Sequence, residues 1–283
     1  MTKNVIVAAL AAGCVAGVAS RARATDLPFS TGFESNQGYA SGSQLSTNAN
    51  WNGDGQDTSG WTVTTSTVNG TAAASGTQWV LASSPTVTTA GGSIPTRFQW
   101  TVTPVTDFTT NPVMVGAADV RLLSPSSGTL NRTTIAGISM YNANIDIIAS
   151  MYLMMDVENT VGLGANRMYI QFIWGDGSDA IYDLNQTSTL GQYYHLELSA
   201  NMATGVVRGS VNGQLLPQIG NTGGATDFHD FDMSVEVTTS TVGGQRARAG
   251  FDNYSIAQVP APAAAALAGL AGATLARRRA RNR

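Results

Sequence analysis

Two short glycine-rich segments carry residue types that could hold a ligand. Each combines one tryptophan with two aspartates: Trp51, Asp54 and Asp57 in the first, and Trp174, Asp176 and Asp179 in the second. A tryptophan face can stack on a sugar ring, and carboxylates beside glycines suit calcium. Both segments are therefore candidate glycan sites, and Asp176 with Asp179 is a candidate calcium site. The alternative is that Asp-Gly is ordinary turn chemistry and that both tryptophans are buried.

One pair of carboxylates has a spacing that could serve acid–base chemistry. Asp156 and Glu158 are two residues apart and would share one face of a strand. Catalytic carboxylates need burial that shifts their pKa, and the neighbouring Asn159 indicates a polar strand end. We therefore expect a solvated strand end instead of a catalytic pair, and we expect that the chain is not an enzyme.

The two histidines allow a similar choice. His195 and Glu197 lie on the outward face of a predicted strand, where a hydrogen bond or a weak metal contact competes with a simple exposed pair. His229 stands in the stretch 227–232, where carboxylates alternate with aromatic residues. Calcium needs six to eight oxygen ligands, and spacing alone does not show that these converge. We expect an exposed pair at His195 and a solvated strand start at His229.

The N-terminus has the parts of a secretory signal. Lys3 provides a positive charge, residues 5–18 are apolar, and Ala22-Arg23-Ala24 forms an A-x-A site, which predicts cleavage after Ala24. A lipoprotein signal is the alternative, because the stretch ending at Cys14 partly resembles a lipobox. Cleavage after Ala24 would remove Cys14, the only cysteine, and leave a mature chain without disulfides or a cysteine nucleophile.

The C-terminus has a second three-part signal. Val259, Pro260, Ala261 and Pro262 lead into an uncharged stretch over 263–276, and Arg277, Arg278 and Arg279 begin an arginine cluster. Such a cluster stays on the cytoplasmic side of a membrane. The uncharged stretch has 14 residues. It would span about 21 Å as a helix, against a hydrocarbon core of roughly 30 Å, which favours a transient anchor.

This tail resembles the PEP-CTERM sorting signal, although Ala261 stands where that family usually has glutamate. The resemblance implies an exosortase-type sorting enzyme as a partner and transient association with the inner membrane. It also implies a final location at the cell surface or outside the cell. We therefore divide the chain into a signal peptide (1–24), a main domain (25–258) and a sorting signal (259–283).

The main domain is strongly acidic. Eight of the 15 basic residues lie in the two signals, so seven arginines remain against all 18 acidic residues, a net charge of −11. Nucleic acids and anionic membrane surfaces bind basic patches, so neither is an expected partner of this domain. Divalent cations and neutral glycans are compatible with the charge.

Alternating apolar residues predict an all-β fold for this domain. The stretches 97–102, 168–174 and 233–238 show the alternation of half-buried strands, and the apolar run 145–155 indicates one or two central strands. Helical periodicity is scarce outside the two end segments. In those segments we expect a signal helix at the N-terminus and a hydrophobic sorting helix at the C-terminus. A main domain of this size is typical of a single β-sandwich.

The stretch from Leu190 to Leu216 has the most specific pattern. Tyr194, Leu196 and Leu198 alternate with polar residues, which predicts one strand with a buried face. A hairpin turn is expected over 201–205, and Asn212-Gly213 after the returning strand predicts a second tight turn. This order resembles the concanavalin A-like lectin and glucanase jelly roll, especially its laminin-G-like members.

That resemblance implies a two-sheet antiparallel jelly-roll sandwich. Gly32-Phe33-Glu34 and Phe251-Asp252-Asn253 resemble its first and last strands, which pair near each other. Glucanases of this fold carry Glu-x-Asp-x-x-Glu, and the sequence has no such motif. We predict an exported, non-catalytic carbohydrate-binding module whose partner is an extracellular polysaccharide. The alternatives are a structural or adhesive surface protein without a small-molecule site, and a divergent glycosidase.

Overall fold

The computed structural model describes residues 27–48, 51–55, 60–68, 72–84, 96–123, 133–157, 159, 162–187, 190–238 and 246–260. The predicted cleavage site at Ala22 and Ala24 and the tail from Ala261 onward, including Arg277–Arg279, lie outside these ranges. The two predicted terminal helices lie outside them as well. Within the ranges, no helix is long and apolar enough to cross a membrane.

The described residues form two antiparallel β-sheets, one of nine strands and one of seven. The nine-stranded sheet contains β1 (Phe29–Thr31), β3 (Thr62–Thr64), β4 (Trp79–Ser83), β6 (Val113–Leu123), β11 (Tyr194–Asn201), β12 (Val206–Val211), β13 (Gln214–Leu215), β14 (Gly220–Asn221) and β16 (Arg248–Val259). The seven-stranded sheet contains β2 (Trp51–Gly55), β5 (Thr96–Val105), β7 (Thr133–Tyr141), β8 (Ile147–Asp156), β9 (Arg167–Trp174), β10 (Asp179–Thr187) and β15 (Phe228–Thr238). Two short 3-10 helices, η2 (Ser35–Gln37) and η3 (Leu45–Thr47), follow β1.

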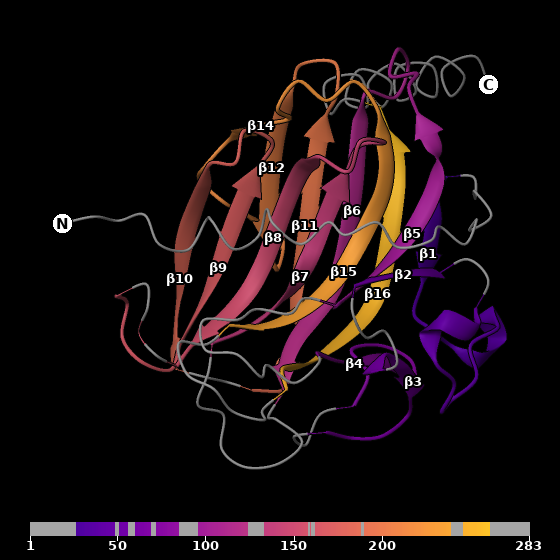
Figure 1. Ribbon diagram of the computed structural model, residues 1–283, viewed down its shortest axis with the longest axis vertical. Helices are drawn as coiled ribbons and strands as arrows, with labels where there is room; N and C mark the ends of the chain where they lie inside the picture. The colour runs from indigo at the N-terminus through magenta and orange to yellow at the C-terminus, as the bar shows by residue number, and fades with distance from the viewer. Residues whose placement is uncertain are drawn as a thin grey trace, which may run out of the picture.

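The two sheets lie face to face, one behind the other in Figure 1. Hydrogen bonds give the order β13-β12-β11-β6-β16-β4-β3 in the nine-stranded sheet, with β1 beside β16 and β14 beside β12. The seven-stranded sheet has the order β10-β9-β8-β7-β15-β5-β2. The predicted all-β, two-sheet antiparallel sandwich is confirmed.

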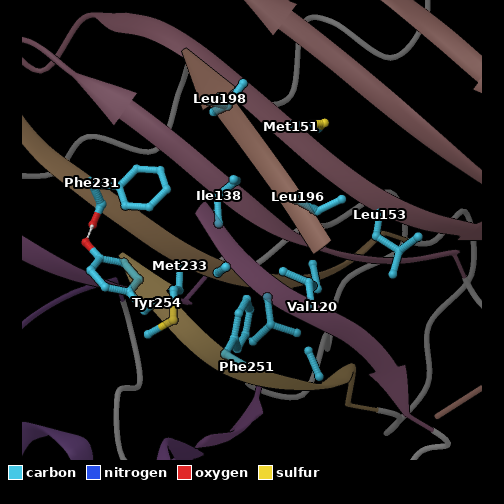
Figure 2. Close-up of a cluster of buried hydrophobic side chains, with 14 of the residues drawn as sticks. Val120, Ile138, Met151, Leu153, Leu196, Leu198, Phe231, Met233, Phe251 and Tyr254 are labelled. Carbon is cyan, nitrogen blue, oxygen red and sulfur yellow. Dashed lines mark hydrogen bonds between the residues drawn. The ribbon is translucent and has the colours of Figure 1, made fainter. Parts of the chain in front are cut away.

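The core lies between the sheets, because alternate residues of each strand point inward. Val120 of β6 and Leu196 of β11 come from one sheet and Ile138 of β7 from the other, and all three are fully buried (Figure 2). A side-chain hydrogen bond also joins the two sheets. The hydroxyl of Tyr254 in β16 donates to the backbone carbonyl of Phe231 in β15 at 2.7 Å.

The hairpin of β11 and β12 matches the sequence prediction. Every second residue of β11, beginning with Tyr194, is buried, and the residues between are only partly buried. Residues 202–205 form the turn between the two strands. Asn212 and Gly213 have φ angles of +51° and +77°, the pair of positive values that a type I′ turn requires.

Other strands are buried on both faces, so the prediction of half-buried strands is wrong for them. In β15, Ser234 and Glu236 are each 6% exposed although they point away from the core. The run 145–155 contributes one central strand, β8, and Asp156 at its end is fully buried. The expected solvated strand end is therefore wrong for Asp156, and Glu158 lies outside the described residues. A second apolar cluster on the outer face accounts for part of this burial: Ile135, Tyr152, Met154, Tyr169 and Ile173.

The first and last strands pair with each other, as the jelly-roll resemblance implied, but the expectation that Gly32-Phe33-Glu34 forms the first strand is wrong, because β1 ends at Thr31. β1 lies against β16 with Thr31 opposite Tyr254, so the first strand ends just before Gly32. β16 continues to Val259, which pairs with Val113 of β6. The predicted sorting motif therefore begins inside the last strand of the sandwich.

We predict that Gly116→Ala destabilises the sandwich by about 1–3 kcal/mol. A Cβ on Gly116 in β6 would lie 2.6 Å from Cζ of Phe231 in β15, so the added methyl group would push the two sheets apart. Gly32→Ala is the matched control, since its Cβ would meet no atom closer than 3.6 Å. Urea-induced unfolding measures both variants, and wild-type stability of Gly116→Ala would contradict the described packing.

Candidate functional site

Trp51 is a core residue and not an exposed platform for a sugar. It is 4% exposed, and its indole Nε1 donates to the hydroxyl of Tyr39 at 2.9 Å. Its ring packs edge-on against Tyr254 with ring centroids 4.9 Å apart. The interpretation that this tryptophan is buried is confirmed. Residues 51–55 form a strand instead of a loop, while Asp57 and the side chain of Asp54 fall outside the description.

Trp174 at the end of β9 is buried in the same way, with 8% exposure. Its ring packs against Phe172 with centroids 5.4 Å apart. Gly220 of β14 leaves room for it, because a Cβ there would lie 2.5 Å from Cγ of the indole. Neither predicted tryptophan offers a face to solvent.

The second segment is a hairpin turn between β9 and β10, and both of its aspartates are engaged locally. Asp176 accepts hydrogen bonds from the backbone N–H of Ser178 at 2.9 Å and from Nδ2 of Asn221 at 2.7 Å. Asp179 accepts one from Nε2 of Gln171 at 2.8 Å. No group of three His, Cys, Asp or Glu residues in the described ranges could hold a metal ion. The two predicted segments are not brought together, because β2 and β10 are opposite edges of their sheet.

A band of polar side chains crosses the outer face of the seven-stranded sheet, and the sequence analysis did not identify it. We call it the polar belt: Ser139 of β7, Ser150 and Tyr152 of β8, Gln171 of β9, Asp179 of β10, and Asp232 and Ser234 of β15. Asp232 lies opposite Ser139, Ser139 opposite Ser150, and Tyr152 opposite Gln171. The belt therefore runs across neighbouring strands, from β15 to β10.

Hydrogen bonds and a close backbone approach order the belt. The hydroxyls of Ser139 and Tyr152 lie 3.1 Å apart, and Gln171 donates to Asp179 as described above. A Cβ on Gly137 of β7 would lie 2.7 Å from Cδ1 of Tyr152, so this glycine lets the tyrosine ring approach the sheet backbone.

Two hydroxyls of this face have no hydrogen-bond partner in the described structure. They belong to Ser150 in the belt and to Tyr169 of β9, and both are buried. Burial raises the pKa of Tyr169, and the nearby carboxylate of Asp156 acts in the same direction, so the phenol remains protonated. Buried polar atoms without a partner are uncommon in native proteins, and a ligand or water that bonds to them is an ordinary explanation.

The belt is closed in its middle and more open toward β10. Ser150 is fully buried and Asp232 is 2% exposed. At the β10 end, Asp179 is only partly buried, and Ile181 is 42% exposed.

One pattern in the sequence indicates a polar outer face on the seven-stranded sheet. Asp230, Asp232, Ser234 and Glu236 occupy alternate positions of β15, and alternate positions share a face. The solvated strand start expected around His229 is wrong, because Asp230 and Asp232 are 3% and 2% exposed. Nδ1 of His229 lies 3.2 Å from Oδ2 of Asp230, so the histidine contacts the next residue of its own strand.

His195 belongs to a cluster of titratable groups on the outer face of the nine-stranded sheet. Its Nδ1 lies 2.7 Å from Oδ1 of Asp119, and Nδ2 of Asn253 donates to Oδ2 of Asp119 at 2.6 Å. The expected exposed pair with Glu197 is therefore wrong in part. His195 faces Asp119 across the β11–β6 pairing, and the histidine side chain is 42% exposed.

Asp252 lies beside this cluster and is fully buried. Its Oδ2 accepts hydrogen bonds from the backbone N–H groups of Ala74 and Ser75 at 2.9 and 3.0 Å. Burial raises the pKa of Asp252 to about 6 against the opposing effect of these bonds, and the Asp119 carboxylate also raises it. The hydrogen bond to Asp119 raises the pKa of His195.

No family model and no curated protein matches the chain. Among solved structures, a Bacteroides ovatus mixed-linkage glucan family 16 protein has a TM-score of 0.46 at 12% identity and covers 81% of this chain and 99% of its own. The family 7 alginate lyase A1-II′ has a TM-score of 0.43 at 15% identity, with coverages of 65% and 78%. A sialidase has a TM-score of 0.44 at 11% identity over 77% of this chain, which spans only 18% of the sialidase. At these identities the similarity concerns the fold alone.

We predict that Trp51→Ala and Trp174→Ala each lower the free energy of unfolding by about 3–5 kcal/mol, because each removes a buried indole from the core. Urea-induced unfolding measures this loss. Gln214→Ala, at an exposed position of β13, is the control and should change little. Wild-type stability of either tryptophan variant would show that its indole is not packed as described.

We predict that stability falls as the pH rises from about 4 to about 8. The folded pKa of Asp252 lies above its usual value of 3.8, so its contribution is lost between pH 3.8 and about 6. The folded pKa of His195 lies above 6.5, so its contribution is lost as the pH rises through that higher folded pKa. Thermal melts across pH measure this decline in stability. Asp252→Asn should flatten the decline between pH 3.8 and about 6, and His195→Gln should flatten the decline at higher pH.

Asp107→Asn is the control for this pH dependence, because Asp107 is exposed and its pKa is lowered by hydrogen bonds from Thr109. Because this pKa is lowered, Asp107→Asn should change the stability only at more acidic pH. An unchanged slope in Asp252→Asn between pH 4 and about 6 would contradict the described environment of Asp252.

Proposed function

We propose that this chain is an exported surface protein whose polar belt binds a neutral polysaccharide without cleaving it. The polar belt is the main support for this proposal. Hydroxyl, amide and carboxylate groups alternate across it, and these are the groups that form hydrogen bonds with sugar hydroxyls. The unpaired hydroxyls of Ser150 and Tyr169 support a ligand that both donates and accepts hydrogen bonds. The resemblance of residues 190–216 to concanavalin A-like lectins points to the same class of ligand.

The charge of the belt favours a neutral glycan over an acidic one. Asp179 and Asp232 lie within the belt, and Asp230 and Glu236 lie beside it on β15. Arg167, at the start of β9, is already paired with Asp183 of β10. The negative charge of these carboxylates would repel an acidic polysaccharide. Since the β10 end is the more open, the glycan would make its first contacts near Asp179.

Export and sorting complete the proposal. The leader ending at Ala24 would direct secretion, and the tail from Val259 would present the protein to an exosortase-type enzyme at the inner membrane. β16 ends at Val259, so the proposed sorting motif begins at the last residue of that strand. The mature sandwich would then be held or released at the cell surface, where polysaccharide is available.

Binding of neutral glucans and mannans to the purified protein tests the function. We expect saturable binding that Gln171→Ala and Tyr152→Phe each weaken by about 3- to 10-fold, since each removes a polar group of the belt. Gln214→Ala, on the other sheet, should bind as wild type does. Affinity electrophoresis or calorimetry measures the binding, and thermal melts show that the variants are folded.

The same experiment separates the alternatives. A folded protein that binds no neutral glycan would refute the belt proposal and favour the structural or adhesive surface protein. A divergent glycosidase is favoured by one observation, the buried Asp230 and Asp232 two residues apart on one face. Release of reducing ends from a bound glucan, lost in Asp232→Asn, would replace binding by hydrolysis as the function.

A further inference from the structure

Arg121 of β6 has an unusual environment for a charged side chain. It is fully buried, and none of its three guanidinium nitrogens has a hydrogen-bond partner in the described structure. Burial lowers the pKa of Arg121, but arginine remains charged in proteins. A buried guanidinium without hydrogen bonds is costly, so its free donors indicate a missing acceptor.

Two aromatic rings hold the guanidinium in place. Its central carbon lies 4.1 Å from the ring centroid of Trp79 and 4.4 Å from that of Tyr193. Trp79 comes from β4 and Tyr193 directly precedes β11, so the rings approach from opposite sides of β6. Gly250 of β16 leaves the space that Arg121 fills, since a Cβ there would lie 2.6 Å from Nε. Arg121 is therefore fixed between two rings with its N–H groups unused.

The neighbouring carboxylate does not supply the missing acceptor. Asp252 already accepts hydrogen bonds from Ala74 and Ser75 through Oδ2 and from the backbone N–H of Asn253 through Oδ1 at 2.8 Å. The hydroxyl of Tyr193 is also buried and has no partner in the described residues. On the outer face of the nine-stranded sheet, a guanidinium without hydrogen bonds thus packs against the ring of a tyrosine whose hydroxyl also has no partner in the described residues.

We propose that the slot formed by Trp79, Arg121 and Tyr193 binds a carboxylate group. The edge of a guanidinium matches the two oxygens of a carboxylate, and the pair is strong where water is excluded. A planar carboxylate can lie in the plane of a guanidinium that is flanked by rings, whereas a tetrahedral sulfate is thicker. Tyr193 is only partly buried, so its ring forms the wall of the slot nearest to solvent. This site is on the sheet opposite the polar belt and does not depend on the proposed glycan function.

The surrounding charges give the site a pH dependence. Asp119, Asp252 and Glu197 supply negative charge near the slot, and His195 supplies positive charge when protonated. Lowering the pH neutralises Asp252 and charges His195, and both changes favour an anion. Tyr193 stays protonated, because burial raises its pKa. Carboxylate binding should therefore tighten as the pH falls from about 7.5 to about 5.5.

Titration of the purified protein with acetate tests the site, with calorimetry and tryptophan fluorescence as readouts. We expect saturable binding and a change in emission, because Trp79 packs on the guanidinium. Arg121→Met keeps an apolar chain of similar length between the rings and should abolish both signals. Tyr193→Phe removes only the buried hydroxyl and should weaken acetate binding by about 3- to 10-fold.

Arg208→Met is the matched control, since Arg208 lies exposed on β12 of the same sheet, and it should bind acetate as wild type does. If Arg121→Met fails to fold, the result for Tyr193→Phe decides, because a phenylalanine ring keeps the packing of residue 193 on the guanidinium. Absence of acetate binding to the folded wild-type protein, or undiminished binding in Tyr193→Phe and Arg121→Met, would overturn the proposal. Binding of sulfate in preference to acetate would overturn the choice of a carboxylate.

Discussion

The close approach of the two sheets is the constraint on which the rest of the structure depends. Phe231 of β15 fills the space that Gly116 leaves open on β6, and the hydroxyl of Tyr254 reaches from β16 to the Phe231 carbonyl. That hydrogen bond can form only at this spacing, because it joins strands of opposite sheets. The inner faces are therefore fixed by packing, and polar side chains with a function are confined to the two outer faces.

This confinement explains which features the sequence predicts well. β11 alternates strictly, because its inner residues meet the other sheet while His195 and Glu197 face outward, so its burial pattern and its hairpin could be predicted. Trp51 and Trp174 were harder to place, since glycines and aspartates around them are typical of turns. Trp51 pairs with Trp100 at the start of an edge strand, and local composition cannot show which way such a side chain points.

The polar belt and the Arg121 slot could not be predicted, because both depend on cross-strand register. Ser139 meets Asp232 only because β7 pairs with β15, although the two strands lie far apart in the chain. Arg121, Trp79 and Tyr193 come from three separate stretches that share one face only after β6 is placed between β11 and β16. The predicted exposure of Asp156 was wrong for a related reason, since burial of the outer face is a property of the assembled sheet and not of the strand.

The two outer faces use their polar groups differently, and the difference follows from charge. On the seven-stranded sheet, Arg167 is paired with Asp183, so the belt offers hydroxyls, amides and carboxylates and suits an uncharged ligand. On the nine-stranded sheet, burial holds the pKa of Asp252 above its usual value although Arg121 lies nearby, as expected if the carboxylate and the guanidinium do not form a direct pair. A direct pair would lower that pKa and use the guanidinium donors. Since Asp252 is committed to backbone N–H groups, the charge of Arg121 is left for a group from outside the described residues, and a carboxylate meets that need with the least change to the packing around it.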